Sequence, residues 1–388
     1  MINTINMNST DWIDVEAACA LLGVKPQTLY AYVSRGQVRA EADALDARRS
    51  LYARIDVETL ARQNRRPRAR AEVAEAAIRW GDPVLRTAIS ELRDGMLWVR
   101  GRSLADCAEA LTLEEMAAHL WAVEMRICPA VEVPAMGKSP IGRVLAYLAQ
   151  ESADATPMQG RTAEEIALEG RRLLAGVAAA LTGHCGGGLL HHRIASAWGI
   201  EPPVANELRR ALVLLAEHEL NPSTFAVRVC ASTGASLPAT LLSGMATLSG
   251  PRHGRVVTLA QKALRAALED RMPAFLGSLE GRNPYGFGFG HPLYPAGDPR
   301  ARQILDMLPP DSPESSAIKR MAERLELAPN IDCALSALSE ARGLPDDAAF
   351  TIFATGRVAG WTAHAIEQAT SGEIIRPRAR FRSPDDQR

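Results

Sequence analysis

The spacing of apolar residues predicts a chain built mainly of helices. From residue 112 onward, apolar side chains recur three and four positions apart in segments 113–121, 208–220, 257–268 and 350–368. This spacing lines one face of an α-helix. The alternation of apolar and polar residues that is typical of half-buried strands is rare there. The pattern therefore predicts an all-α architecture for the larger part of the chain.

Glycine and proline clusters divide this helical part. Breaks are expected at residues 183–188, 202–203, 251 and 309–310, because these residue types favour turns and end helices. The chain has 388 residues, more than a usual single hydrophobic core contains. We therefore expect two or three domains.

The N-terminal residues 1–60 form a module of their own. Asp14 can cap a helix that runs through Leu22, Gly23 supplies a turn, and Pro26 opens a second helix that ends near Ser34. Two helices joined by a short glycine turn are the geometry of a DNA-reading helix-turn-helix.

This module resembles the winged MerR-type and excisionase-type modules through residues 29–36, 48–52 and 56–57. The resemblance implies a β-wing and a closing helix after the two helices. A small helical protein-interaction module is the alternative, because the fold alone does not fix function. The residues expected to contact DNA are Gln27, Thr28 and Tyr30 in the groove and Arg48 and Arg49 on the wing.

Residues 61–85 are expected to form a basic linker. Five arginines fall within nine residues: Arg62, Arg65, Arg66, Arg68 and Arg70. Such a density suits phosphate contacts. Solvated linker charge is the more common explanation for a run of this kind, but the neighbouring helix-turn-helix favours nucleic acid. The whole chain has 44 basic and 45 acidic residues, so only a local patch can favour nucleic acid or a membrane surface.

The six cysteines stand singly, without a Cys-x-x-Cys pair, which indicates reduced thiols and argues against a disulfide scaffold or a zinc site. His184, Cys185, His191 and His192 lack a neighbouring carboxylate, so we expect no metal there. There is no apolar signal core and no run of eighteen apolar residues. We expect a soluble, cytoplasmic protein without a membrane partner.

Residues 286–300 carry the most chemical information. Gly286, Gly288 and Gly290 let the backbone turn and approach a ligand, His291 follows at once, and Arg300 can grip a carboxylate in two places. This combination predicts a small-anion site, with a Gly/Pro-rich surface loop as the alternative.

The same segment resembles the citrate synthase family, whose pattern is a Gly-rich turn, a His and then Asp-Pro-Arg. The resemblance runs from near Ser90 to the C-terminus, and residues 94–101 resemble the family's opening hairpin. Further family motifs follow in the family's order at residues 216–225, 249–254, 329–332, 356–361 and 375–379.

This resemblance implies a fold and a domain plan. A large helical domain formed by residues 86–254 and 343–388 would be interrupted by a small helical domain at residues 255–342. The site would lie in the cleft between them, which can close on substrate and expel water.

The implied reaction is a Claisen condensation of acetyl-CoA or propionyl-CoA with oxaloacetate, giving citrate or 2-methylcitrate and CoA. The resemblance assigns Asp332 as the base, His253 as the donor to the thioester oxygen, and His291 as the group that polarises the ketone. A base alone is insufficient, because charge that develops on the thioester oxygen needs a donor. No cofactor or metal is implied beyond the CoA substrate.

The resemblance also implies how the substrate carboxylates are held. Arg300, Arg357 and Arg376 match the family's three oxaloacetate arginines, and His218 matches a further oxaloacetate ligand. A planar guanidinium pairs with a carboxylate at two points, which lysine cannot do. In the family, the residue matching Arg376 comes from the partner subunit, so a homodimer is implied.

Some residues depart from the family pattern. Arg252 replaces a small or apolar residue before His253, Arg255 begins a segment that usually reads Gly-Ala-Asn, and Pro295 replaces a basic residue that contacts CoA in several members. The added cations can lower the proton affinity of His253, or Arg252, Arg255 or Arg282 can bind the CoA phosphates. The alternative function is therefore a catalytically weak, metabolite-sensing regulator that binds DNA.

Overall fold

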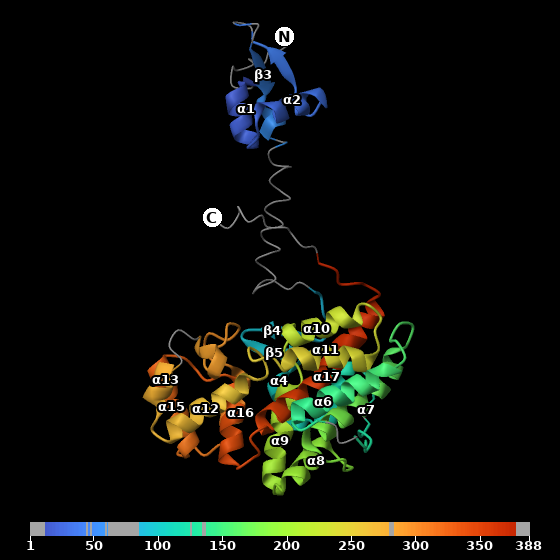
Figure 1. Cartoon of the computed structure of the whole chain (residues 1–388), viewed down its shortest axis with the longest axis vertical. Helices are drawn as coiled ribbons and strands as arrows, with labels where there is room; N and C mark the ends of the chain where they lie inside the picture. Colours follow the sequence, from blue (N-terminus) through green and yellow to red (C-terminus); the bar gives the residue numbers. More distant parts are fainter. Residues whose placement is uncertain are drawn as a thin grey trace, which may run out of the picture. The chain divides into compact units, whose positions relative to one another are not determined.

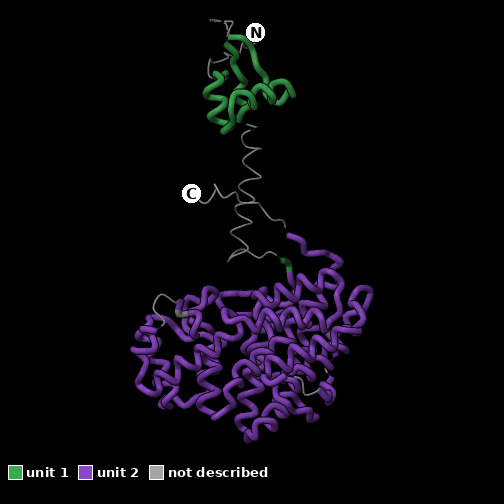
Figure 2. The backbone as a smooth tube through the Cα atoms, in the orientation of Figure 1, with its two compact units in different colours: residues 1–86 green, residues 87–388 purple. Residues whose placement is uncertain are grey.

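The computed structural model describes residues 12–43, 46, 49–58, 60, 85–124, 126–133, 137–278 and 283–377. The chain divides into two compact units, unit 1 at residues 1–86 and unit 2 at residues 87–388 (Figure 2). The predicted DNA contact Arg48 and most of the predicted basic linker lie outside the described residues, as does Arg282.

Unit 1 contains two short helices and a three-stranded antiparallel sheet, followed by a further helical segment at residues 54–58. Asp14 caps the first helix by accepting a hydrogen bond from the amide of Ala17, and Gly23 ends it with a φ of +64°, a left-handed conformation that favours glycine. Both helices lie where the sequence predicts them. The elements are β1 (Trp12–Ile13), α1 (Val15–Leu22), α2 (Pro26–Ser34), β2 (Ala40–Ala42) and β3 (Ser50–Ala53), with sheet order β1-β3-β2.

A small apolar core holds unit 1 together. It is separate from the core of unit 2 and includes Ala18, Leu29, Val38, Tyr52 and Val57. Leu29 of α2 is fully buried, whereas its neighbours in the first turns of α2 are exposed. The second helix therefore presents a polar face to solvent while its apolar face packs on α1 and the sheet.

Unit 2 opens with a small sheet and continues as helices, as Figure 1 shows. Asp94 and Gly95 both have positive φ values, of 51° and 72°, which is the backbone of a tight hairpin turn between the first two strands. The three strands pair in the order β4-β5-β6. They are β4 (Ser90–Arg93), β5 (Met96–Val99) and β6 (Arg102–Ser103).

The helices begin where side chains satisfy their free backbone amides. Thr112 and Glu115 form a capping box at the start of α5, and Thr162 and Glu165 form another at the start of α7. The helices are α4 (Leu104–Ala110), α5 (Leu113–Trp121), α6 (Pro140–Ala153), α7 (Ala163–Thr182), α8 (Leu190–Trp198), α9 (Pro202–Leu215), α10 (Pro222–Ala231), α11 (Leu237–Leu248), α12 (Val256–Leu268), α13 (Met272–Ser278), η1 (Pro284–Phe287, a 3₁₀ turn), α14 (Pro299–Leu305), α15 (Pro313–Leu325), α16 (Ile331–Ala341) and α17 (Ala348–Ser371).

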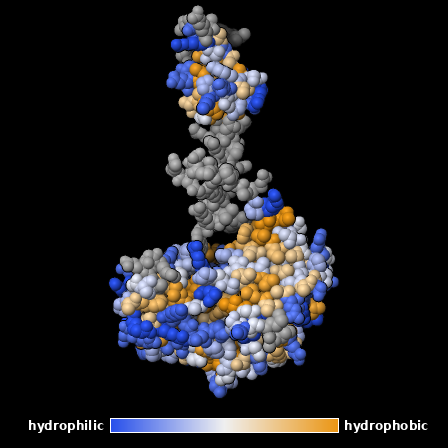
Figure 3. All heavy atoms as spheres, viewed as in Figure 1, coloured by the Kyte–Doolittle hydropathy of each residue, from blue (hydrophilic) through white to orange (hydrophobic). Residues whose placement is uncertain are grey.

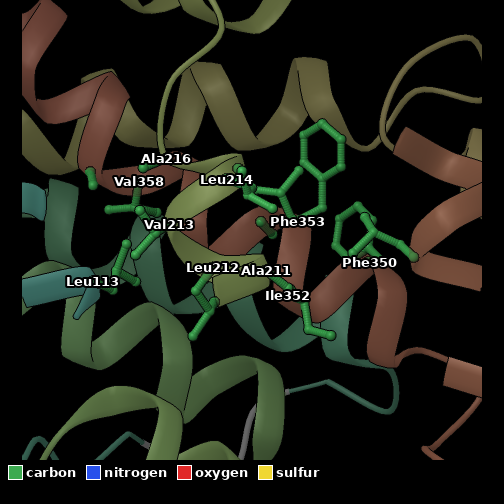
Figure 4. Close-up of a cluster of buried hydrophobic side chains, with 14 of the residues drawn as sticks. Leu113, Ala211, Leu212, Val213, Leu214, Ala216, Phe350, Ile352, Phe353 and Val358 are labelled. Carbon is green, nitrogen blue, oxygen red and sulfur yellow. The ribbon is translucent and has the colours of Figure 1, made fainter. Parts of the chain in front are cut away.

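The long helix α17 runs through the core of unit 2. Its apolar side chains pack against α9 and α5, and Figure 4 shows Phe353 and Val358 of α17 among Leu212, Val213 and Leu113. Burial of such side chains is the main stabilising contribution to a fold of this kind.

Two glycines bring the backbones of α9 and α17 unusually close. A side chain on Gly356 would come within 2.6 Å of the carbonyl oxygen of Leu212, and one on Gly360 within 2.2 Å of the carbonyl oxygen of Ala216. Real Cβ atoms do not approach other atoms so closely. The two glycines therefore let the end of α9 rest on the backbone of α17.

The predicted helix at residues 208–220 is too long at its C-terminal end. Helix α9 stops at Leu215, and the Glu217–His218 segment that follows is an irregular loop with Glu219 at a φ of +49°. The predicted boundaries of 113–121 are confirmed, and α12 and α17 lie at the other predicted segments. The expected break at Pro202 and Pro203 is confirmed: it falls between α8 and α9, and the two prolines begin α9.

Helices α12, α13, α15 and α16 gather at one end of unit 2 (Figure 1). They fall within the predicted small domain at residues 255–342, whose boundaries remain a prediction. Among the described residues, no helix combines the length and the apolar character that a membrane span requires.

Candidate active site

Side chains from five separate segments of unit 2 meet in one buried neighbourhood. His218 comes from the loop after α9 and His291 from the segment before α14, and their ring centroids lie 5.3 Å apart. Tyr294 lies between them and Arg300: its ring centroid is 4.9 Å from that of His291 and 5.8 Å from the Arg300 Cζ atom. The predicted Gly-rich segment and the first predicted histidine motif therefore share one site.

The His253 turn and helix α17 form the other side of the neighbourhood. The rings of His253 and Phe353 lie edge to face with centroids 6.3 Å apart, and the Arg357 Cζ atom lies 5.4 Å from the Phe353 centroid. Phe353 thus lies next to both His253 and Arg357. Burial lowers the pKa of His253, followed by the charge of Arg357, and it lowers the pKa of His218, followed by the charges of Arg300 and then Arg357.

The segment before His291 is joined to the segment before Asp332 by backbone hydrogen bonds. The amide of Gly290 donates to Ala328, and the amide of Asn330 donates to Gly288. The side chain of Asn330 adds a donation to the Gly290 carbonyl at 3.0 Å and caps α16 by accepting from the amide of Asp332. Asp332 therefore stands in the first turn of α16, fixed to the glycine segment.

A serine hydroxyl holds the His253 ring. Nε2 of His253 lies 2.9 Å from Oγ of Ser223, and that hydroxyl lies 2.7 Å from Oδ1 of Asn221. Asn221 caps α10 by accepting from the amides of Ser223 and Thr224. A helix cap thus also sets the orientation of a predicted catalytic imidazole.

All three imidazoles of the site are disposed to be neutral. Burial, followed by the charge of Arg300, lowers the pKa of His291 to about 4. Burial, followed by Arg357, lowers the pKa of His253 to about 4. The pKa of His218 also falls well below its usual range because of burial. At neutral pH each ring can therefore donate through one nitrogen and accept through the other.

Backbone and side-chain contacts restrict which nitrogen carries the proton. The amide of Leu293 donates to Nδ1 of His291 at 3.1 Å, so the proton of the neutral ring sits on Nε2. Nε2 of His218 lies 3.0 Å from the Tyr294 hydroxyl, whose pKa rises to about 12 because of burial.

Asp332 is buried, and its Oδ1 atom has no hydrogen-bond partner. Burial raises the pKa of this carboxyl to about 7; Arg300 opposes the shift and Asp298 adds to it. A carboxyl with such a pKa can accept or release a proton near neutral pH.

The guanidinium of Arg300 is held by the carboxylate of Asp298. Its Nε and Nη2 atoms donate to the two oxygens of Asp298 at 3.0 and 2.7 Å, and both side chains are buried. Burial opposes the charge of Arg300, but Asp298 outweighs that effect and raises the pKa above its ordinary value. A bidentate pair of this kind fixes the guanidinium plane before any ligand arrives.

Arg357 is fully buried and differs from Arg300 in its partners. Its Nε donates to the carbonyl of Leu215 at 2.9 Å, but Nη1 and Nη2 have no hydrogen-bond partner among the residues that the structure describes. Burial lowers the pKa of Arg357 to about 10, with Glu217 acting in the opposite direction, so the group stays protonated at neutral pH. Two unpaired buried donors on a cation indicate a site for an anionic ligand.

Other predicted site residues lie outside this cluster. Arg376 is exposed in the segment after α17, and no described contact within the chain joins it to the cluster. Gly288 has a φ of +103°, and a side chain there would lie 3.0 Å from Cβ of Cys333. Gly288 therefore serves close packing against α16. Among the described residues, no group of three or more His, Cys, Asp or Glu side chains is arranged to hold a metal ion.

The predicted DNA contacts of unit 1 that the structure describes are on its surface. Gln27, Thr28 and Arg49 are exposed, and 54% of Tyr30 is exposed.

Several residues of the site are not singled out by the sequence. They are Glu217, Ser223, Tyr285, Tyr294, Asp298 and Asn330. A signal in the sequence does exist at two positions: Asn221 and Asn330 each stand directly before a helix, where they cap it, and each fixes a neighbouring site residue.

Comparison with known proteins finds relatives of the helical part of the chain. Residues 145–378 match the family model "Citrate synthase, C-terminal domain". Citrate synthase 2 of Bacillus subtilis is 34% identical over 204 residues, which cover 49% of this chain and 55% of the relative. The 2-methylcitrate synthase of Shewanella oneidensis is 32% identical over 183 residues, which cover 44% of this chain and 48% of the relative. The chain thus spans about half the length of the curated relatives that it matches.

Solved structures agree with this match. Citrate synthase from Thermotoga maritima superposes with a TM-score of 0.65 at 26% identity, covering 78% of this chain and 94% of that one. The enzyme from Thermoplasma acidophilum, solved as a ternary complex with carboxymethyl coenzyme A and oxaloacetate, superposes with a TM-score of 0.63 at 20% identity and covers the same shares of the two chains, which is evidence for the fold. Since the family model covers more than half of the chain and the fold superposes on a solved citrate synthase, this protein belongs to the citrate synthase family.

Proposed function

We propose that the protein catalyses a citrate synthase-type condensation of acetyl-CoA or propionyl-CoA with oxaloacetate. The observation that carries the proposal is a buried carboxyl with a free oxygen, Asp332, grouped with neutral imidazoles and with the unpaired guanidinium of Arg357. An acid–base group and a fixed cation in one enclosed site suit a reaction between a carbon acid and an anionic acceptor.

In the proposed reaction, Asp332 removes a proton from the methyl or methylene carbon next to the thioester. The charge moves to the thioester oxygen, to which His253 donates a hydrogen bond. For this, His253 must carry its proton on Nδ1, which requires the Ser223 hydroxyl to donate to Nε2 rather than to Asn221. The 2.9 Å contact with Ser223 allows that choice.

The new carbon–carbon bond forms when the enolate attacks the ketone carbon of oxaloacetate. His291 donates from Nε2 to the ketone oxygen, a role that fits its Nδ1 contact with the Leu293 amide. Water then hydrolyses the thioester, releasing CoA and the tricarboxylic acid. Each of these groups is neutral or near its pKa at pH 7, as general acid–base work requires. The reaction needs no cofactor beyond the CoA substrate.

We assign the oxaloacetate carboxylates to Arg357, Arg300 and His218, and the CoA phosphates to Arg252 and Arg255. Arg252 and Arg255 are exposed beside the partly buried His253, as a phosphate contact next to a reaction centre requires. The Thermoplasma enzyme was solved with carboxymethyl coenzyme A and oxaloacetate bound, and we extend that ligand pair to this chain.

We further propose a homodimer in which Arg376 completes the partner's site. The exposed position of Arg376 fits this assignment. Apolar side chains gather on the face of unit 2 that carries α10 and α11 (Figure 3), including the half-exposed Phe225, Val229 and Leu242. A patch of this kind suits a contact between subunits. All six cysteines are free thiols, which fits the expected cytoplasmic location.

A thiol-release assay tests the proposed reaction. Purified full-length protein is mixed with oxaloacetate and either acetyl-CoA or propionyl-CoA, and free CoA is followed with a thiol reagent. We expect release that depends on both substrates, and product analysis should find citrate or 2-methylcitrate. Binding of oxaloacetate without any release would favour the sensing role over the enzymatic one.

For unit 1 we propose binding to duplex DNA by a winged helix-turn-helix. The observation that favours it is the exposed polar face of α2, with Gln27, Thr28 and Tyr30 outward, next to an antiparallel sheet whose β2–β3 connection contains Arg49. Helices presented in this way enter the major groove in known DNA-binding modules.

A further inference from the structure

Glu217 stands directly before His218 and is completely buried, yet the proposed reaction does not use it. Its Oε1 atom accepts a hydrogen bond from the Ser90 hydroxyl at 2.9 Å. The same atom lies 3.2 Å from Nε2 of His364. One buried carboxylate is thus attached both to strand β4 and to helix α17.

The His364 ring is oriented to donate to Glu217. Arg228 has only donors, and its Nη1 lies 3.5 Å from Nδ1 of His364. The Nδ1 atom is therefore the acceptor, and Nε2 carries a proton that is directed at Glu217. Arg228 is itself fixed, because its Nε donates to Gln368 at 2.7 Å and it pairs with Glu367.

The backbone of α17 makes room for this carboxylate. A side chain on Gly360 would lie 2.5 Å from Oε2 of Glu217. Arg357, Gly360 and His364 are three and four positions apart, so they share one face of the helix. The Glu217 carboxylate therefore packs against Gly360, between Arg357 and His364 on the same face of α17.

Strand β4 also holds the far side of His218. Burial raises the pKa of the Glu219 carboxyl, the backbone of Leu92 in that strand opposes this effect, and Glu219 has a φ of +49°. Few residues other than glycine adopt this conformation without support. Residues 90 and 92 point to the same side of the strand, which explains how one strand contacts both neighbours of His218.

We propose that Glu217 is a positioning residue of the oxoacid site, and that its hydrogen bonds to Ser90 and His364 hold the adjacent His218 in place to bind the 2-oxo acid. This inference rests on the proposed function, because it assigns His218 to oxaloacetate. The carboxylate also supports Arg357 by charge, opposing the effect of burial on the pKa of that group.

The first test removes one anchor and leaves every charge in place. In Ser90→Ala, we expect the KM for oxaloacetate to rise about three- to tenfold, while the KM for acyl-CoA and kcat change less than about twofold. A lost hydrogen bond to a charged group is large enough for such a change when a second anchor remains. Ser90→Thr, which retains the hydroxyl, should restore the wild-type KM.

The matched control is Ser103→Ala in the same sheet. Ser103 caps α4 through the amide of Asp106 and belongs to none of the contacts around His218. Its replacement should lower the melting temperature without changing the KM for oxaloacetate. If Ser90→Ala and Ser103→Ala have the same kinetic effect, the positioning role of Glu217 is wrong.

The second test displaces Glu217 by sterics. Gly360→Ala should raise the KM for oxaloacetate more than Ser90→Ala does, because its methyl group cannot coexist with Oε2 in the present position. Gly170→Ala is its control. Gly170 belongs to α7, and a side chain there would lie 2.7 Å from Thr362 of α17, with no contact to Glu217 within 4 Å among its three nearest atoms. Both variants should lose stability, but only Gly360→Ala should lose affinity for the oxoacid.

Failure of this inference is distinguishable from failure of the proposed function. Calorimetric binding of oxaloacetate to the wild-type protein measures the oxoacid site without turnover. A wild-type protein that neither binds oxaloacetate nor releases CoA overturns the proposed function. A wild-type protein that does both, with unchanged oxaloacetate affinity in Ser90→Ala and Gly360→Ala, overturns the assignment of Glu217 alone.

Discussion

Unit 1 and unit 2 differ in whether their buried polar atoms have hydrogen-bond partners. In unit 2, Asp332, Arg357 and Glu217 each have a buried polar atom without a hydrogen-bond partner. Among the described residues of unit 1, no buried side-chain nitrogen or oxygen lacks a partner, and its bidentate Arg39–Asp56 pair lies near the surface. Leaving a buried polar atom unpaired is costly, so proteins retain such atoms mainly for ligands or chemistry. The proposal of an enclosed ligand site therefore rests on unit 2, whereas the proposed binding by unit 1 uses surface side chains.

The largest expected effect comes from removing the buried base. In Asp332→Ala, turnover should fall by about two orders of magnitude or more, because general-base catalysis contributes that much. Oxaloacetate should still bind, since the arginines and His218 remain. Steady-state kinetics and calorimetry measure the two quantities. Turnover near the wild-type rate would remove Asp332 from the mechanism.

The two buried arginines should respond differently to replacement by lysine. Arg357→Lys and Arg300→Lys should each raise the KM for oxaloacetate about tenfold or more, with a smaller change for acyl-CoA, because an ammonium cannot reproduce the planar fork. Only Arg300→Lys also breaks a bidentate pair, with Asp298, so it should lower the melting temperature more. Equal effects on both substrates would mean that these arginines support the fold alone.

The raised pKa of Asp332 predicts a pH-dependent cost to stability. Its pKa is 3.8 in an unfolded chain and about 7 when buried. Below pH 4 the carboxyl is protonated in both states and has no effect, whereas above pH 7 the folded state must hold the charge. Asp332→Asn should therefore be more stable than the wild type above pH 7, by on the order of 3–4 kcal/mol, and equal to it near pH 4.

Thermal unfolding of both proteins between pH 4 and pH 8 measures this difference. The low pKa values of His253 and His291 destabilise the fold as the pH falls from about 6.5 to 4, but they do so in both proteins and cancel. A stability difference that is constant over this range would contradict the buried-carboxyl argument.

The smallest effect on catalysis is expected from removing unit 1. A chain that begins near Ala71 should retain condensation within about twofold, because the described site residues all belong to unit 2. The same truncation should abolish binding to duplex DNA, which in the full-length protein should weaken steeply as salt rises and should favour inverted half-sites. Gel-shift or anisotropy titrations at several salt concentrations measure this.

A full-length protein that shows no salt-sensitive DNA binding at low ionic strength would make unit 1 an interaction or structural element. Loss of catalysis in a truncated protein that still folds and dimerises would contradict the independence of the two units.

The sequence predicts much of the helical frame and the members of the site. Helix α5 has the predicted bounds, and His218, His253, His291, Asp332, Arg300 and Arg357 lie in one neighbourhood. The order of the motifs is sufficient to predict this grouping, because each motif carries one reactive side chain in a short turn or at the beginning of a helix.

Long-range polar contacts cannot be predicted in the same way. Ser90 and His364 lie 127 and 147 positions from Glu217, and no local pattern links them. The end of α9 is not predictable either, since Glu217 and His218 continue an amphipathic helical pattern, while tertiary contacts with β4 and α17 hold them in a loop. The sequence suggests a ligand contact for Gly288, but the nearby Cys333 gives it a packing role that only the fold reveals.

The hydrogen bonds between the Gly288–Gly290 segment and Asn330 have a mechanical consequence. They join the backbone that carries His291 to the backbone that carries Asp332, whereas His218 and Arg357 are held by contacts between α17 and the end of α9. In the proposed reaction, the base and the ketone-polarising ring are therefore linked through one hydrogen-bonded segment. A substitution that shifts this segment relative to α17 should change proton removal and ketone polarisation together.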